Sequence, residues 1–251
     1  MNHPTKRSRV RIVGIGMGPQ HVTPEAAAAL RDADYVIAAE KREGDALLAI
    51  RREIADAFGV PVVAVADPAR DREAVGDGGY VGAVEGWHAA RVAAYEAVLA
   101  ERQGTAAFLV WGDPSFYDST IRIVESIAAR GAVEVDYDVV PGISALQLLA
   151  ARHRIVLHDI GQPLHVTTAR RLSEAVAAGA DNIAVMLGSG PALDGLEDWQ
   201  IWWGGNLGTP SEELVAGRFG DVLSDVESAR ERARRSAGWV MDIYLLRGPG
   251  E

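Results

Sequence analysis

The stretch AAFLVWGDPSFY, residues 106–117, decides the fold class. Its first five residues are apolar, as in a buried strand, and a Gly-Asp-Pro turn then leads into the helical pattern of residues 115–130. In open parallel sheets, ligands bind outside the carboxyl ends of the strands. Gly112 allows a close backbone approach there. Asp113 can accept hydrogen bonds from a ligand, cap a helix that has Pro114 in its first turn, or do both.

The same alternation extends over the first 150 residues. Strand patterns at 9–13, 34–38, 60–66, 106–110 and 133–140 alternate with helical patterns at 23–31, 45–58, 87–102, 115–130 and 143–152, and the glycine-rich stretch 75–86 is expected to be a loop. This order predicts a mostly parallel sheet covered by helices. Further on, strand patterns at 164–168, 183–187, 200–203 and 239–246 lie between shorter helices, which predicts a mixed α/β domain. We therefore expect a two-domain α/β protein with domains 1–155 and 156–251.

Composition excludes several classes of protein. The chain has 251 residues, of which 48% are hydrophobic, and 25 Lys and Arg stand against 35 Asp and Glu, a net charge of −10. Such an acidic chain is a poor nucleic-acid binder. It has no cysteine, which excludes disulfides, thiolate nucleophiles and iron–sulfur clusters, and its six histidines have no metal-ligand spacing. No apolar run reaches eighteen residues, so we expect no membrane span and a cytoplasmic protein.

Three further turns follow predicted strands. GIGMGP, residues 14–19, has three alternate glycines, but a dinucleotide fingerprint requires glycine where Pro19 stands. A plain tight turn, contact with some cofactor, and nicotinamide or flavin binding all stay open. In PGISA, residues 141–145, Ser144 can cap a helix or touch a ligand, and NLGTP, residues 206–210, is by itself more often a turn than a site.

Taken together and in this order, the GxGxG loop, the WGDPxxY turn, the PGxS turn and the late Gly-Thr turn resemble the tetrapyrrole methylases over essentially the whole chain. The resemblance implies binding of S-adenosyl-L-methionine between two α/β domains, and a homodimer. Segments such as LVWGDPS (109–115) and GWVMDIYLLR (238–247) resemble the family members that methylate C1 of a precorrin, a metal-free tetrapyrrole, and release acetate in cobalamin biosynthesis.

The predicted activity is therefore that of an S-adenosylmethionine-dependent C-methyltransferase. Three alternatives stay open: methylation at another ring position, a dinucleotide-dependent oxidoreductase using the loop at Gly14, and an inactive relative that only binds and hands on precorrins.

The resemblance also implies which residues contact the cofactor. They are Pro19, Trp111, Gly112, Asp113, Phe116, Ser144, Ala145, Leu187, Gly208 and Thr209. One departure concerns the first loop, where Gly18 is followed directly by Pro19 although the family usually has one more residue between them.

Candidate catalytic groups are Asp113, Tyr117 and His88, in that order, as a base or a water-positioning group. His88 shares a helical face with Arg91 and Tyr95, and this face can be an exposed polar surface or a wall of the macrocycle site.

Basic side chains near the domain boundary are candidates for substrate binding. Arg152, Arg170 and Arg171 can pair with the carboxylates of a corrin precursor, or can form an ordinary solvated surface. The dense tryptophans at 199, 202 and 203 indicate a buried strand or a subunit interface rather than substrate stacking.

Overall fold

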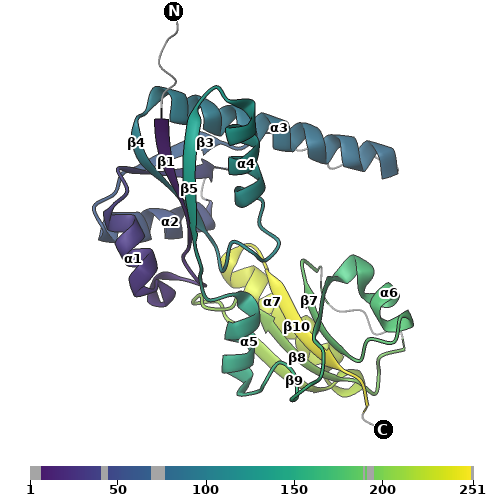
Figure 1. The fold of residues 1–251 in the computed structure, drawn as a ribbon. Helices are drawn as coiled ribbons and strands as arrows, with labels where there is room; N and C mark the ends of the chain where they lie inside the picture. The colour runs from purple at the N-terminus through teal and green to yellow at the C-terminus, as the bar shows by residue number, and fades with distance from the viewer. Residues whose placement is uncertain (1–6, 41–44, 69–76, 189, 191–194, 250–251) are drawn as a thin grey trace, which may run out of the picture. The chain divides into compact units, whose positions relative to one another are not determined.

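The structure is a computed structural model that describes residues 7–40, 45–68, 77–188, 190 and 195–249 (Figure 1). It forms two compact units, Met1–Ile143 and Ser144–Glu251. The division falls twelve residues before the boundary expected at 155, because the helix at 145–153 packs within the second unit, where Leu149 lies against Gly204.

The first unit contains a five-stranded sheet in the order β3-β2-β4-β1-β5, in which every pair is parallel. Its strands are β1 (Arg7–Gly14), β2 (Tyr35–Glu40), β3 (Val62–Ala66), β4 (Gly104–Val110) and β5 (Glu134–Val140), and its helices are the 3-10 turn η1 (Pro19–His21), α1 (Pro24–Arg31), α2 (Ala46–Ala57), α3 (Asp77–Glu101) and α4 (Thr120–Arg130). The parallel sheet predicted from the sequence is confirmed.

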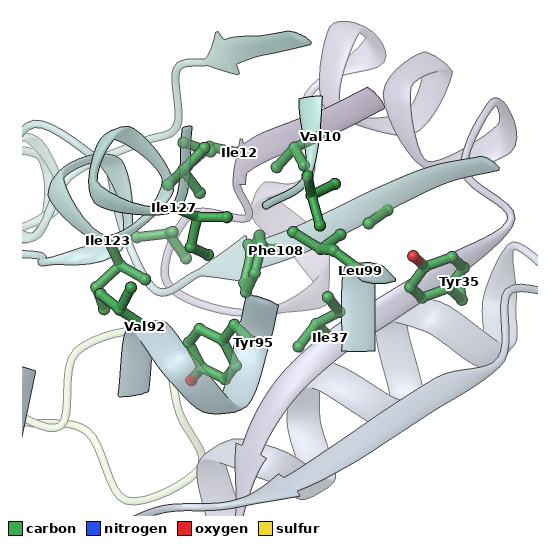
Figure 2. Close-up of a cluster of buried hydrophobic side chains, with 14 residues drawn as sticks. Val10, Ile12, Tyr35, Ile37, Val92, Tyr95, Leu99, Phe108, Ile123 and Ile127 are labelled. Atoms are coloured by element: carbon green, nitrogen blue, oxygen red, sulfur yellow. The ribbon is translucent and has the colours of Figure 1, made fainter. Parts of the chain in front are cut away.

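Helices cover both faces of this sheet. On one face, α3 and α4 pack against the cluster shown in Figure 2, which includes Tyr95, Phe108 and Ile123. On the other face, α1 and α2 supply Leu30 and Ile54 to a second buried cluster. Burial of apolar side chains on both faces explains why β2 and β4, inside the sheet, are continuous hydrophobic runs, whereas β5 at the edge alternates.

Local sequence signals start the two helices of the second cluster. The hydroxyl of Thr23 accepts a hydrogen bond from the amide of Ala26 at 3.1 Å, and a carboxylate oxygen of Asp45 accepts one from the amide of Leu47 at 3.0 Å. The expectation for 75–86 was wrong where the structure describes it, because α3 already begins at Asp77. Glycine lowers helix propensity by about 1 kcal/mol per residue but does not prevent helix formation.

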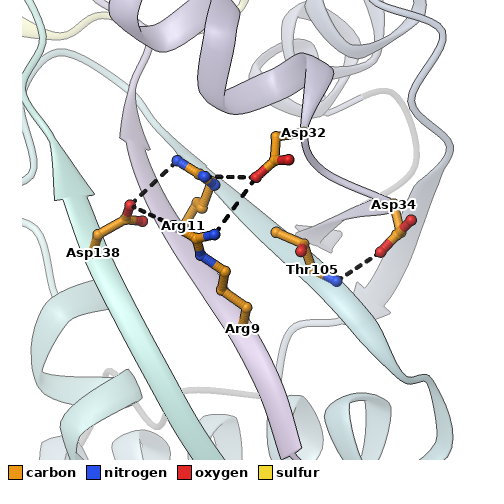
Figure 3. A network of polar contacts seen from close by, with 6 residues as sticks. All are labelled: Arg9, Arg11, Asp32, Asp34, Thr105 and Asp138. Carbon is orange, nitrogen blue, oxygen red and sulfur yellow. Dashed lines mark hydrogen bonds and ion pairs between the residues drawn. The ribbon is translucent and has the colours of Figure 1, made fainter.

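Charged pairs fix the register of the sheet edge. Arg11 on β1 donates to Asp138 on β5 at 3.2 Å and also contacts Asp32 after α1, while Arg9 lies within ion-pair distance of the same two carboxylates (Figure 3). Opposite charges on facing strands favour this pairing over a slipped one.

The second unit contains a mixed five-stranded sheet in the order β6-β7-β10-β8-β9, in which only β6 and β7 pair in parallel. Its elements are α5 (Ala145–His153), β6 (His165–Thr168), the 3-10 turn η2 (Ala169–Arg171), α6 (Leu172–Ala177), β7 (Asn182–Met186), β8 (Gln200–Gly205), β9 (Glu213–Arg218), α7 (Phe219–Ala237) and β10 (Asp242–Arg247). This confirms the predicted mixed α/β domain.

The core of the second unit lies between the sheet and helices α6 and α7. Trp203 on β8 is fully buried there, next to Tyr244 on the paired strand β10. For Trp203, the interpretation as part of a buried strand is therefore confirmed. Within the described residues of both units, no helix is long and apolar enough to cross a bilayer.

Candidate functional site

The end of β4 is flanked on both sides by points where the chain changes direction. The helices that follow β1 and β2 pack on one face of the sheet, whereas the helix that follows β4, their common neighbour, packs on the other. At such switch points the connections diverge and leave a crevice outside the carboxyl ends of the strands. The turn at residues 111–116 therefore occupies the position where open α/β sheets bind ligands.

Three glycine turns meet at this position. Gly16 and Gly112 exchange backbone hydrogen bonds of 2.8 and 3.1 Å, which join the loop after β1 to the turn after β4. A Cβ atom on Gly142 would lie 2.2 Å from the carbonyl oxygen of Gly112 and 2.8 Å from the carbonyl carbon of Gly14. Only glycine allows the three backbones to come this close, so the sequence builds a cluster of turns with bare backbone.

The carboxylate of Asp113 holds two of these turns together. One oxygen accepts hydrogen bonds from the amide, at 2.8 Å, and the hydroxyl of Ser115, and the other accepts one from the amide of Gly142 at 2.9 Å. Burial raises the pKa of Asp113, but these hydrogen bonds outweigh burial and hold the pKa below its ordinary value. Asp113 therefore stays ionised at neutral pH and is a weak proton acceptor.

Asp113 does not cap the following helix, which corrects one of the two interpretations of this residue. Helix α4 begins at Thr120 rather than at Ser115, because the backbone of Tyr117 has a positive φ of 50°. Asp118 accepts a hydrogen bond from the amide of Thr120 at 2.6 Å and so satisfies a donor of the first helical turn. Residues 113–119 form a loop.

Several predicted contact residues lie on the exposed side of this cluster. Phe116 and Tyr117 are 36% and 45% exposed, unusually high for large aromatic side chains, and Pro19 is exposed at the start of η1. The indole nitrogen of Trp111 is buried and has no hydrogen-bond partner among the described residues. Bare backbone, exposed aromatic surface and an orphaned donor together fit a flat, polar-edged ligand such as the predicted cofactor.

In the second unit, Ser144 and Ala145 start helix α5. The hydroxyl of Ser144 accepts from the amide of Gln147, and the Gln147 side chain accepts from the amide of Ser144 at 2.7 Å, a complete capping box. The capping role of Ser144 is thus confirmed, and contact with a ligand stays a prediction.

The turn at Gly208 and Thr209 is held by two side chains that the sequence reasoning missed. Asn206, with φ of 48°, accepts from the amide of Met241 at 2.8 Å and donates to the carbonyl of Trp239 at 3.0 Å. Glu212 accepts from the amide of Gly208 at 2.7 Å. The signal for Asn206 was its residue type, since Asn tolerates left-handed backbone better than most residues do.

The predicted substrate-binding arginines differ in their surroundings. Arg152 donates to Glu212 at 2.8 Å and thereby belongs to the support of the Gly208 turn. Arg171 forms an exposed ion pair with Glu174 one helical turn away, and Arg170 also lies in η2. Leu187, directly after β7, is 65% exposed and has φ of 55°.

The helical face with His88 is not a uniform polar surface. Tyr95 is 5% exposed and belongs to the core, so for this residue the interpretation as an exposed polar surface was wrong. Arg91 donates to Asp67 at 2.6 Å and lies over the ring of Trp87, whose edge contacts His88. In the described part of the chain, no three His, Asp or Glu side chains gather as a metal site.

Comparison with known proteins gives consistent relatives. Residues 9–223 match the family of tetrapyrrole (corrin/porphyrin) methylases. The chain is 43% identical over 250 residues to a precorrin-6A synthase [deacetylating] of Sinorhizobium sp, with 95% of both chains covered. It is similar to the crystal structure of a cobalamin synthesis related protein (CobF) from Corynebacterium diphtheriae, at 37% identity and a TM-score of 0.81, with 96% of this chain and 98% of that chain covered.

A more distant neighbour shares the fold alone. The uroporphyrin-III C-methyltransferase of Thermus thermophilus, in complex with S-adenosyl homocysteine, is 18% identical with a TM-score of 0.57, and 96% of this chain and 97% of that chain are covered.

Proposed function

The chain belongs to the tetrapyrrole (corrin/porphyrin) methylases and is a methyltransferase, and from this premise we propose that it converts precorrin-5 to precorrin-6A. In this reaction a methyl group passes from S-adenosyl-L-methionine to C1 of the macrocycle, and acetate is released. The observation that carries the proposal is the 43% identity to a precorrin-6A synthase over 95% of both chains.

The cluster of glycine turns in the first unit supports the cofactor assignment. Gly14 and Gly142 carry no side chain at the point where the turns meet, and Trp111 keeps a donor without a partner among the described residues beside them. When bound, S-adenosyl-L-methionine supplies a methyl group already activated on a sulfonium, so the protein has to position the reacting carbons rather than activate the methyl group. Asp113 contributes by fixing the turns. Contacts of the cofactor with Pro19, Phe116, Ser144, Ala145, Leu187, Gly208 and Thr209 are part of the proposal.

Release of acetate can supply the electrons that methylation consumes. Water adds to the acetyl carbonyl, the carbon–carbon bond breaks, and its electron pair enters the conjugated macrocycle, where it forms the new bond to the methyl carbon. The water oxygen leaves in acetate, and both protons of the water are released. Tyr117, exposed on the loop before α4, is the proposed water-positioning group, since both oxygens of Asp113 and one oxygen of Asp118 already accept hydrogen bonds.

The test is anaerobic incubation with precorrin-5 and methyl-labelled S-adenosyl-L-methionine. We expect one labelled methyl group at C1 and one acetate per product, measured by mass spectrometry and NMR. Tyr117→Phe is expected to leave S-adenosylhomocysteine binding intact and to slow acetate release. Methylation at another carbon would show a different precorrin methylase, and absence of turnover with intact cofactor binding would contradict the proposal.

Two further assignments rest on the resemblance to the family. We propose that the protein is a homodimer located in the cytoplasm, and that Arg152, Arg170 and Arg171 bind carboxylates of the substrate. Light scattering that gives the mass of one chain at micromolar concentration would contradict the dimer.

A further inference from the structure

Arg51 lies in the first unit where β2 and β4 stop pairing, a position called here the crevice between β2 and β4. The two strands pair through Ile37 and Phe108, and pairing ends there although both strands continue. The carbonyl of Leu109, the next residue of β4, therefore lacks a β2 partner. Arg51, on helix α2, donates its Nε to this carbonyl at 2.8 Å. A charged side chain thus fills the place where the sheet opens.

The Nε contact uses only part of the guanidinium. A guanidinium carries five N–H donors, and in the described residues the two terminal nitrogens of Arg51 have neither an ion pair nor a hydrogen bond. Burial lowers the pKa of Arg51, and the charges of Asp45 and Asp118 oppose this effect from a distance. A partly desolvated cation without a direct anionic partner is costly, and an anionic ligand would offset the cost.

The neighbourhood favours an anion. Arg91, a second cation close enough to affect Arg51, is already paired with Asp67 at 2.6 Å. The crevice also lies beside β4, whose end carries the glycine turns described above. Arginine binds carboxylates through two parallel hydrogen bonds, and neither terminal nitrogen of Arg51 has a hydrogen bond or ion pair to another described residue.

We propose that Arg51 binds a carboxylate of a ligand in the crevice between β2 and β4. This inference rests on the proposed function, because both ligands of that reaction carry carboxylates. One source is the amino-acid part of S-adenosyl-L-methionine, and the other is a side-chain carboxylate of the macrocycle.

The experiment compares Arg51→Gln with Arg52→Gln, which removes the same charge from an exposed position of the same helix. Glutamine keeps a donor for the Leu109 carbonyl but loses the charged fork. Three ligands are titrated by calorimetry or absorbance: S-adenosylhomocysteine, 5′-methylthioadenosine, which lacks the amino-acid part, and precorrin-5. The binding measurements need no turnover, so they remain informative if the proposed reaction is wrong.

Loss of a charge-assisted bidentate contact weakens binding by about 10- to 100-fold. A loss for S-adenosylhomocysteine but not for methylthioadenosine identifies the cofactor carboxylate, and a loss for precorrin-5 alone identifies the substrate. Arg51→Lys, which keeps the charge without the fork, should restore part of the affinity. Equal affinities in Arg51→Gln and Arg52→Gln, or an equal loss for all three ligands accompanied by a lower melting temperature, would overturn the proposal.

Discussion

Replacing Asp113 by asparagine should separate a residue that holds the turns from one that accepts a proton. The carboxylate receives three hydrogen bonds, from the amide and hydroxyl of Ser115 and from the amide of Gly142. Asparagine has one oxygen to offer, so in either orientation its NH₂ group faces a backbone donor. One turn then loses its connection to Asp113.

The magnitude follows from the contact that is lost. A hydrogen bond to a charged group contributes about 1.5–3 kcal/mol, so Asp113→Asn should lower the free energy of unfolding by about that amount at neutral pH. The pKa of Asp113 is below its ordinary value of 3.8 in the folded protein. The stabilisation is therefore complete above this ordinary value and disappears as the pH falls through the lower, folded value, so the two proteins should converge in strong acid.

Urea unfolding between pH 3 and pH 7 measures the stability difference, and calorimetry with S-adenosylhomocysteine measures its effect on the site. Ser115→Ala is the matched control, because it removes one hydrogen bond to the carboxylate and keeps the bond from the Gly142 amide; since Ser115 is exposed, it should cost no more than about 1.5–3 kcal/mol. The reasoning is refuted if Asp113→Asn is as stable as the unmodified protein. A fall in kcat of more than about 100-fold with unchanged stability and cofactor affinity would instead identify Asp113 as a base.

Three other substitutions test separate features. Gly142→Ala should cost at least about 3 kcal/mol and abolish S-adenosylhomocysteine binding, because its Cβ would meet backbone atoms at 2.2 and 2.8 Å. Gly86→Ala, with open space around it inside α3, should instead stabilise the protein by up to about 1 kcal/mol, and equal melting temperatures for the two variants would contradict this close approach. Burial lowers the pKa of His153, although its hydrogen bond to the Trp203 carbonyl opposes this effect, so the free energy of unfolding should fall as the pH drops below 6.5. In urea titrations His153→Gln should reduce this fall, and His158→Gln, at an exposed position, should not. Tyr244→Phe removes a buried hydroxyl with no partner among the described residues, so it should raise the free energy of unfolding by about 1 kcal/mol. A clear decrease in the urea midpoint would show instead that the hydroxyl has a hydrogen-bond partner.

Elements with local signals could be predicted from the sequence. The start of α1 follows from the Thr23 cap, and the strands of the first unit follow from apolar runs that end at turn residues. Strand β9, Glu213–Arg218, was not predicted, because its sequence ELVAGR does not alternate apolar and polar residues as its burial does, and because it lies at the edge of the mixed sheet, where Leu214 is exposed. The start of α4 was misplaced because Tyr117 has a positive φ, which prevents the helix from beginning before it. Tyrosine is not a residue type that indicates positive φ.

The candidate site divides in the same way. Glycine and aspartate after β4 could be predicted as a turn near a ligand, since residue type and position sufficed. The contact of that turn with Gly14 and Gly142 depends on the register of β1 with β4 and β5, which only the folded sheet determines. Arg51 was missed for the same reason: its position in a helical pattern gives no indication that the strands beside it stop pairing at Phe108.

Backbone conformation gives an argument about the predicted site that residue types do not. Four non-glycine residues of the described chain have positive φ: Tyr117 and Asn206 lie in turns singled out from the sequence, Leu187 is a cofactor contact implied by the family resemblance, and the fourth is Arg154. For Asn206 the positive φ costs little free energy, and the side chain forms hydrogen bonds that hold its turn. Its conformation is therefore explained by the fold. Leu187 is neither a residue type that tolerates positive φ nor a side chain that can form hydrogen bonds. Its φ of 55° costs about 1 kcal/mol or more, and its apolar side chain is 65% exposed. Packing within the second unit explains neither cost, and strain of this kind concentrates where a protein binds ligands. Among the predicted cofactor contacts of that unit, Leu187 is therefore the one for which a structural role is the weakest explanation.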